Sequence, residues 1–163
     1  MGDGLGYSPK AESRVDLSRR RAEHRSAQMR LPLPEAPEGE LSFPENIGKL
    51  SDDSLLHQMG YWAALVGYAQ YQVAVFDSAS TGAEALYEET FALKYRSSPD
   101  SSVTDKRHHS EADSAVRSAK AAYTQLRGDA KVLSALFKGY EQKYYALSRE
   151  LTRRKSDAGQ GYG

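Results

Sequence analysis

The sequence predicts an all-α protein built on a long, coiled-coil-like antiparallel helical hairpin, with a flexible or extended N-terminal arm. Three observations lead to this prediction. Apolar residues recur at alternating steps of four and three along two segments, one after Ser51 and one after Thr104. A serine-rich break separates the two segments, and a proline-rich region precedes the first. The composition, with 39% hydrophobic and 27% charged residues, suits an elongated helical body better than a thick globule.

Residues 1–50 form the predicted arm. Its marked features are three spaced glycines, an arginine cluster and a group of four prolines after position 30: Gly2, Gly4, Gly6, Arg19, Arg20, Arg21, Pro32, Pro34, Pro37 and Pro44. Such a segment cannot bury much apolar surface, so we expect it to be disordered, or extended along a partner.

The hairpin domain is predicted to span residues 51–155, and its first helix begins at Ser51-Asp52-Asp53, which offer a cap and first-turn acids. The apolar seam of this helix consists of Leu55, Met59, Trp62, Val66, Ala69, Val73, Phe76, Ser80, Ala83 and Tyr87. The run from Ser97 to Ser101, which includes Pro99, ends the pattern.

The second helix is predicted to begin near Thr104-Asp105. Its seam consists of Ala112, Val116, Ala119, Tyr123, Leu126, Ala130, Leu133, Phe137, Tyr140, Tyr144, Leu147 and Leu151. Two such helices joined by a short loop must fold back on each other. Residues 156–163 are predicted to be a flexible tail.

The two seams predict an interface within the hairpin and between copies of the chain. Its expected members are Trp62, Val66, Val73, Phe76, Leu126, Leu133, Phe137, Tyr140, Tyr144 and Leu147. A further stripe widens the apolar face of the first helix beyond what one partner helix covers: Leu65, Tyr68, Gln72 and Val75. We therefore expect a homo-oligomer.

Several classes of function are disfavoured. The chain balances 22 Lys and Arg against 22 Asp and Glu, so a uniformly basic nucleic-acid binder is excluded. It has no cysteine, no apolar run of membrane-span length and no apolar signal-peptide core, so we expect a cytoplasmic protein without membrane contact. No nucleophile elbow, phosphate-binding loop or paired acids occur, and adjacent His108 and His109 point apart. We expect no enzyme, cofactor or metal site.

Charge is nevertheless segregated along the chain into three basic clusters: the arginines of the arm, a cluster around the hairpin loop, and the C-terminal group Arg149, Arg153, Arg154 and Lys155. The helix dipole alone favours cations at a C-terminus, which accounts for the last cluster structurally. The loop cluster is Lys94, Arg96, Lys106 and Arg107. Because Lys106 and Arg107 stand at the unfavourable start of a helix, we predict that this cluster binds phosphates.

The run Phe91-Ala92-Leu93-Lys94-Tyr95-Arg96, a short polar loop, and a second helix ending Ala146-Leu147-Ser148-Arg149-Glu150-Leu151 resemble phage recombination mediators of the UvsY type. The resemblance covers roughly Ser51 to Lys155 and consists of the helix layout with the Ala-Leu-Lys-x-Arg match. It implies a helical homo-oligomer, in the bacterial host cytoplasm if phage-encoded, that binds single-stranded DNA. It also implies a protein that loads a RecA-like recombinase onto strands covered by single-strand-binding protein in DNA recombination, replication and repair. Lys94 and Arg96 then match the family's DNA-contacting pair.

Two other functions stay open. The chain can be a structural protein of a phage particle or its assembly, with the arm running along neighbouring subunits and the hairpin supplying contacts. It can also be an adaptor for one helical partner.

Overall fold

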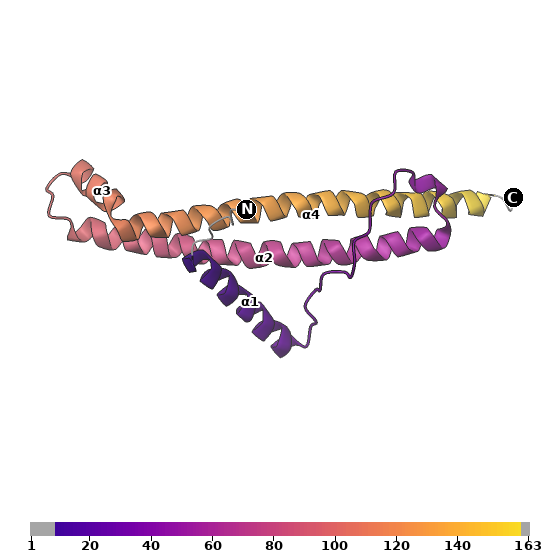
Figure 1. Ribbon diagram of the computed structural model, residues 1–163, viewed down its shortest axis with the longest axis horizontal. Helices are drawn as coiled ribbons and strands as arrows, with labels where there is room; N and C mark the ends of the chain where they lie inside the picture. The colour runs from indigo at the N-terminus through magenta and orange to yellow at the C-terminus, as the bar shows by residue number, and fades with distance from the viewer. Residues whose placement is uncertain (1–8, 161–163) are drawn as a thin grey trace, which may run out of the picture. The chain divides into compact units, whose positions relative to one another are not determined.

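The computed structural model describes residues 9–160, and within them every regular element is helical (Figure 1). The elements are α1 (Pro9–Met29), the short 3-10 helix η1 (Ile47–Lys49), α2 (Asp52–Ser97), α3 (Val103–Ala112) and α4 (Ser114–Gln160). None of these helices contains an apolar stretch long enough to cross a bilayer.

Helices α2 and α4 divide between two compact units. Unit 1 combines the described part of 1–32 with Ala74–Val132, and unit 2 combines Leu33–Val73 with the described part of 133–163. In each unit, one half of α2 packs on one half of α4. Late α2 meets early α4 in unit 1, whereas early α2 meets late α4 in unit 2. The prediction of an all-α antiparallel helical hairpin is confirmed.

Helix α2 begins where the sequence predicts it. The Ser51 hydroxyl accepts a hydrogen bond from the Ser54 amide at 3.2 Å, and Asp52 and Asp53 occupy the first turn, where they complement the helix dipole. The helix ends at Ser97, two residues before Pro99.

Unit 2 is built on an aromatic core. Leu55 and Leu147 are fully buried, and Trp62 is 4% exposed. Half-buried residues pack around these three, some from the irregular segment before α2: Phe43, Ile47, Leu50, Met59, Tyr61, Leu65, Tyr140, Tyr144 and Leu151. The Trp62 indole donates to Gln58, and the Lys143 ammonium lies 4.3 Å from the Trp62 ring centroid.

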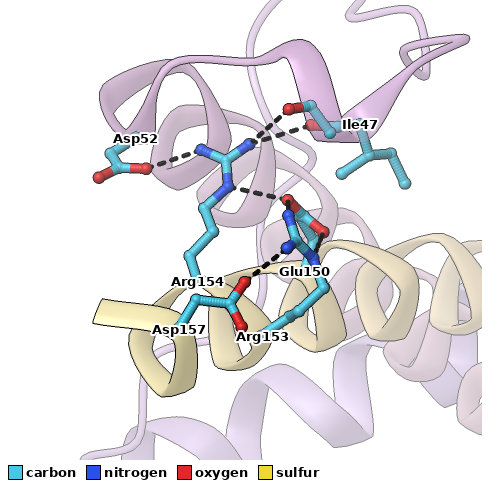
Figure 2. A network of polar contacts seen from close by, with 7 residues as sticks. Ile47, Asp52, Glu150, Arg153, Arg154 and Asp157 are labelled. Carbon is cyan, nitrogen blue, oxygen red and sulfur yellow. Dashed lines mark hydrogen bonds and ion pairs between the residues drawn. The ribbon is translucent and has the colours of Figure 1, made fainter. Parts of the chain in front are cut away.

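A polar network closes the same unit near the start of α2 (Figure 2). The Arg154 guanidinium contacts Asp52 at 2.7 Å, Glu150 at 2.9 Å and the carbonyls of Ile47 and Gly48 at 3.3 Å. Hydrogen bonds from Arg153 and then Arg154 lower the pKa of Glu150 to about 2. Two cations of the C-terminal basic cluster therefore stabilise the fold.

Unit 1 has a core of small residues. Buried positions on α2 and α4 include Val75, Ala79, Ala83, Val116, Ala119, Ala122, Leu126 and Ala130. Small side chains let helix backbones approach closely, and the tyrosines Tyr87 and Tyr123 stack with ring centroids 6.5 Å apart and planes at 6°.

Helix α1 packs against α2 in unit 1. The Arg14 guanidinium donates to the Gly82 carbonyl at 2.7 Å, and the Ser18 and Ser78 hydroxyls lie 3.4 Å apart. Val15 and Ser18 are buried on this side. A Cβ at position 82 would lie 3.2 Å from Arg14 Nη1, so glycine permits the close approach.

The structure differs from the sequence expectations in the N-terminal arm. Pro9–Met29 is helical, whereas the segment from Leu31 to Asn46 has no regular secondary structure, and Gly2, Gly4 and Gly6 lie outside the described residues. Most residues of α1 favour helix, and contacts with α2 add the tertiary packing that a helix with few apolar residues needs.

The second arm of the hairpin is broken rather than continuous. Helix α3 ends at Ala112, and Asp113 adopts an extended conformation with φ −62° and ψ 134°. Its carboxylate accepts hydrogen bonds from the amides of Ala115 at 2.8 Å and Val116 at 3.3 Å. The side chain thus caps α4, which is why the chain interrupts the helix at this point.

Two residues of the further apolar stripe pack within the chain, whereas Tyr68 and Gln72 are half-buried. Val75 is 3% exposed in unit 1, and Leu65 packs into the aromatic core of unit 2. Of the predicted interface residues, Trp62, Leu126 and Leu147 are buried, and the remaining seven are half-buried: Val66, Val73, Phe76, Leu133, Phe137, Tyr140 and Tyr144. The C-terminal segment is helical to Gln160, and residues 161–163 lie outside the described part.

Candidate nucleic-acid interface

The four predicted DNA-binding residues all lie in unit 1, around the loop that follows α2. Lys94 and Arg96 occupy the last turn of α2, and Lys106 and Arg107 lie on α3, which folds back beside that end of the hairpin (Figure 1). Ser102 caps α3 by accepting a hydrogen bond from the Asp105 amide at 3.1 Å.

Lys94 is held by the residue that breaks the second arm. Its Nζ lies 2.8 Å from Asp113 Oδ2, with the lysine side chain 43% exposed and the aspartate side chain 23% exposed. The hydrogen bond from Lys94, followed by those from the amides of Ala115 and Val116, lowers the pKa of Asp113. The carboxylate is therefore ionised near neutral pH and competes with any other anion for Lys94.

Arg96 is an exposed cation of this cluster. Its side chain is exposed, and its Nε donates to the Ala92 carbonyl at 3.2 Å. Within the described residues it makes no ion pair, so most of its donors face solvent.

Lys106 and Arg107 differ in their surroundings. Lys106 is half-buried and has no ion pair among the described residues, while its carbonyl accepts a hydrogen bond from Ser110 Oγ at 2.7 Å. Arg107 Nε lies 2.9 Å from Glu111 Oε1, and the two side chains are 69% and 39% exposed. This hydrogen bond raises the pKa of Arg107 and lowers the pKa of Glu111.

The segment from Lys94 to Asp113 is electrically neutral. Its cations are matched in number by acids: Asp100, Asp105, Glu111 and Asp113. His109 adds a contact of 3.6 Å from Nδ1 to Asp100. Among the residues that the structure describes, no group of three or more potential ligands could hold a metal ion.

Aromatic residues beside this segment are engaged in packing. Tyr87, Phe91 and Tyr95 form a ladder along α2 with neighbouring ring centroids 6.3 and 6.1 Å apart, and all three are half-buried. Tyr123, stacked on Tyr87, donates to Glu84 at 2.8 Å, and this hydrogen bond raises the pKa of the tyrosine. The ladder is part of the core of unit 1, and the polar contacts of the site come from the loop cations.

Sequence reasoning identified the four cations but missed two features. It did not detect that Asp113 pairs with Lys94, because the pair depends on the break between α3 and α4. It also predicted a disordered or extended arm, whereas the arginines of the arm lie on helix α1.

Comparison of the chain with protein-family models, curated proteins and solved structures finds no match.

Proposed function

We propose that the chain is a non-enzymatic recombination mediator that binds single-stranded DNA through Lys94, Arg96, Lys106 and Arg107. In this role it promotes the loading of a RecA-like recombinase onto strands covered by single-strand-binding protein. The observation that carries the proposal is the accessibility of the last turn of α2, where Arg96 is exposed without an acidic partner and Lys94 is held by a single carboxylate. The resemblance to UvsY-type mediators supplies the biological setting.

The ion pairs at this end do not prevent phosphate binding. Exposed pairs between Lys or Arg and Asp or Glu typically contribute only about 0.2–1 kcal/mol. Both partners of the Arg107–Glu111 pair are at least 39% exposed, so water reaches them. A phosphate can therefore replace a carboxylate at small cost, and Arg can bind it through two parallel hydrogen bonds.

Because the segment from Lys94 to Asp113 carries no net charge, each copy of the chain binds a strand weakly. Several copies linked together would bind more tightly. Unit 1 exposes large apolar residues near the same end, which is compatible with contacts between copies: Leu86 is 37%, Leu93 55% and Val103 73% exposed. Leu86 and Leu93 are seven residues apart and share one face of α2. We propose a homo-oligomer on this basis.

A structural role in a phage particle has less support. It depends on an arm that runs along neighbouring subunits, whereas α1 and the segment from Phe43 to Leu50 contact the chain's own helices. Finding the protein in stoichiometric amounts in purified particles would favour that role over mediation.

The experiment is a filter-binding titration of a labelled oligothymidylate at low salt, with the corresponding duplex as the comparison. Sedimentation of the same samples measures the oligomeric state. Retention of the single strand in preference to the duplex supports the proposal. If the single strand is not retained at low salt, the proposal is wrong.

A further inference from the structure

A second basic surface lies on α1, outside the loop cluster. A shallow crevice of about 530 Å³ is lined by side chains of this helix alone. We call it the arginine face, and its members are Leu17, Arg20, Arg21, His24, Arg25 and Gln28. All six side chains are exposed.

The arginine face lies next to the anchoring side of α1, and two of its members, Leu17 and Arg21, also line a crevice against α2 with Ser78, Ala79 and Gly82. Arg14, Val15 and Ser18 attach the helix to α2, with Arg14 and Ser18 bonded to Gly82 and Ser78. Leu17, Arg21, His24 and Gln28 follow one another at steps of four and three, so they form one continuous stripe. The stripe therefore begins beside α2 and continues along exposed positions of α1.

Charge on α1 is divided between two sides. Asp16 and Glu23 are seven residues apart and share one side, where Asp16 lies 3.8 Å from Arg19. No acidic residue lines the arginine face. In the described part of the chain, Arg20, Arg21 and Arg25 make no ion pair, and all three line the same crevice, Arg21 and Arg25 being one helical turn apart. Such a cluster is costly to maintain and favours an external anion.

We propose that the arginine face of α1 binds the phosphate backbone of single-stranded DNA, as a second contact surface separate from Lys94 and Arg96. Guanidinium groups match phosphate oxygens in planar, paired hydrogen bonds, and neighbouring turns of a helix offer them in a row. This inference rests on the proposed function for the identity of the strand, while the surface itself is independent of the loop cluster.

Other anionic partners fit this face less well. A helix that binds anionic membranes needs a broad apolar side, whereas the inner side of α1 is occupied by α2 and only Leu17 is apolar on the arginine face. A protein partner would need an apolar centre to its interface, which three arginines, a histidine and a glutamine do not provide.

The test uses the full-length chain and fluorescence anisotropy of a labelled oligothymidylate over a range of salt concentrations. One variant carries Arg20→Gln, Arg21→Gln and Arg25→Gln, since glutamine preserves helix preference. The matched control removes the same charge from exposed positions of unit 1 by Arg117→Gln, Lys120→Gln and Lys131→Gln.

In a plot of the logarithm of the binding constant against the logarithm of the salt concentration, we expect the slope of the α1 variant to be smaller in magnitude by about 2. Each phosphate contact on a single strand contributes about 0.7 to this slope. At 0.1 M salt the expected decrease in slope corresponds to roughly 100-fold weaker binding by the same relation. The control should change far less. Equal weakening by both variants would show a general charge effect and overturn the proposal.

A gain of charge provides a second test that does not depend on removing residues. His24→Arg extends the arginine face and should tighten binding about fivefold at 0.1 M salt, the contribution of one contact. Thr124→Arg adds the same charge to an exposed position of α4 and should have little effect. Tightening by both variants to the same extent would contradict the inference.

Further comparisons of variants and ligands separate this inference from the proposed function. If Lys94→Gln/Arg96→Gln loses binding and the α1 variant binds as the wild type does, the arginine face does not bind DNA and the proposed function stands. If the α1 variant loses binding and Lys94→Gln/Arg96→Gln binds as the wild type does, the arginine face binds DNA and the loop cluster does not. If polyglutamate or phosphatidylserine vesicles bind as tightly as the oligonucleotide and the α1 variant abolishes this, single-stranded DNA is the wrong partner.

Discussion

Replacement of Leu147 by alanine should destabilise unit 2 strongly. Leu147 is fully buried and packs in the cluster with Leu55 and Trp62. Leucine-to-alanine changes in a packed core cost about 2–5 kcal/mol, the sum of lost transfer free energy and the cavity left behind. Alanine has the higher helix preference, so the loss comes from packing and not from the helix itself. We expect a decrease of about 3 kcal/mol in the free energy of unfolding.

The assay is urea denaturation followed by tryptophan fluorescence and circular dichroism. Trp62 is the sole tryptophan and is 4% exposed, so its emission reports this core directly. The matched control is Leu136→Ala, on the same helix and in the same unit, where the side chain is 46% exposed. Because nearly half of Leu136 already faces water, its truncation removes less buried area than that of Leu147, and we expect the control to lose about 1 kcal/mol.

Equal losses in the two variants would refute the reasoning. They would mean that Leu136 is as buried in solution as Leu147, as would occur if copies of the chain packed through that face. Dilution over a wide range of protein concentration distinguishes this outcome, since stability that depends on association falls with dilution.

Three further changes follow from the polar contacts. The pKa of the Glu150 carboxyl is lowered to about 2. The contribution of this carboxylate to stability is therefore present above its ordinary pKa and is lost as the pH falls toward 2. Glu150→Gln should flatten this part of the plot of urea midpoint against pH. Asp113→Asn should keep the cap of α4 while releasing Lys94, and should tighten oligothymidylate binding roughly twofold to fivefold, the range for an exposed pair. Unchanged or weaker binding would show that Lys94 does not contact phosphate. Gly82→Ala should displace Arg14, because the Arg14 Nη1 atom would lie 3.2 Å from the new Cβ. We expect faster amide hydrogen exchange in α1 as a result. Unchanged exchange would show that this contact does not hold α1.

The long helices were predictable because their signals are local and repeated. Many residues on alternating steps of four and three mark each apolar seam, and the serine cap and the proline-bearing break mark the ends of α2. Helix α1 was not predicted because it has few apolar residues to mark a helical face, although most of its residues favour helix. It also contacts residues 60 and 68 positions away, Ser78 and Gly82.

The candidate site was predictable in its residue types and not in its pairing. Lys94, Arg96, Lys106 and Arg107 stand out by their position around a loop. The pairing of Lys94 depends on the break at Asp113, whereas Arg107 pairs locally with Glu111 on the same helix. A single helix-ending residue gives too small a signal to predict that break within a continuous apolar pattern. Local sequence therefore located the cations, and tertiary geometry determined their partners.

The measurement that tests the central claim most directly is the salt dependence of single-strand binding by Lys94→Gln/Arg96→Gln compared with the wild-type chain. Two phosphate contacts account for about 1.4 in the log–log slope, and we predict that the variant loses this amount. Arg117→Gln/Lys120→Gln, with the same charge removed from α4, should retain the wild-type slope. A slope unchanged by the loss of Lys94 and Arg96 would show that the end of α2 does not bind the strand.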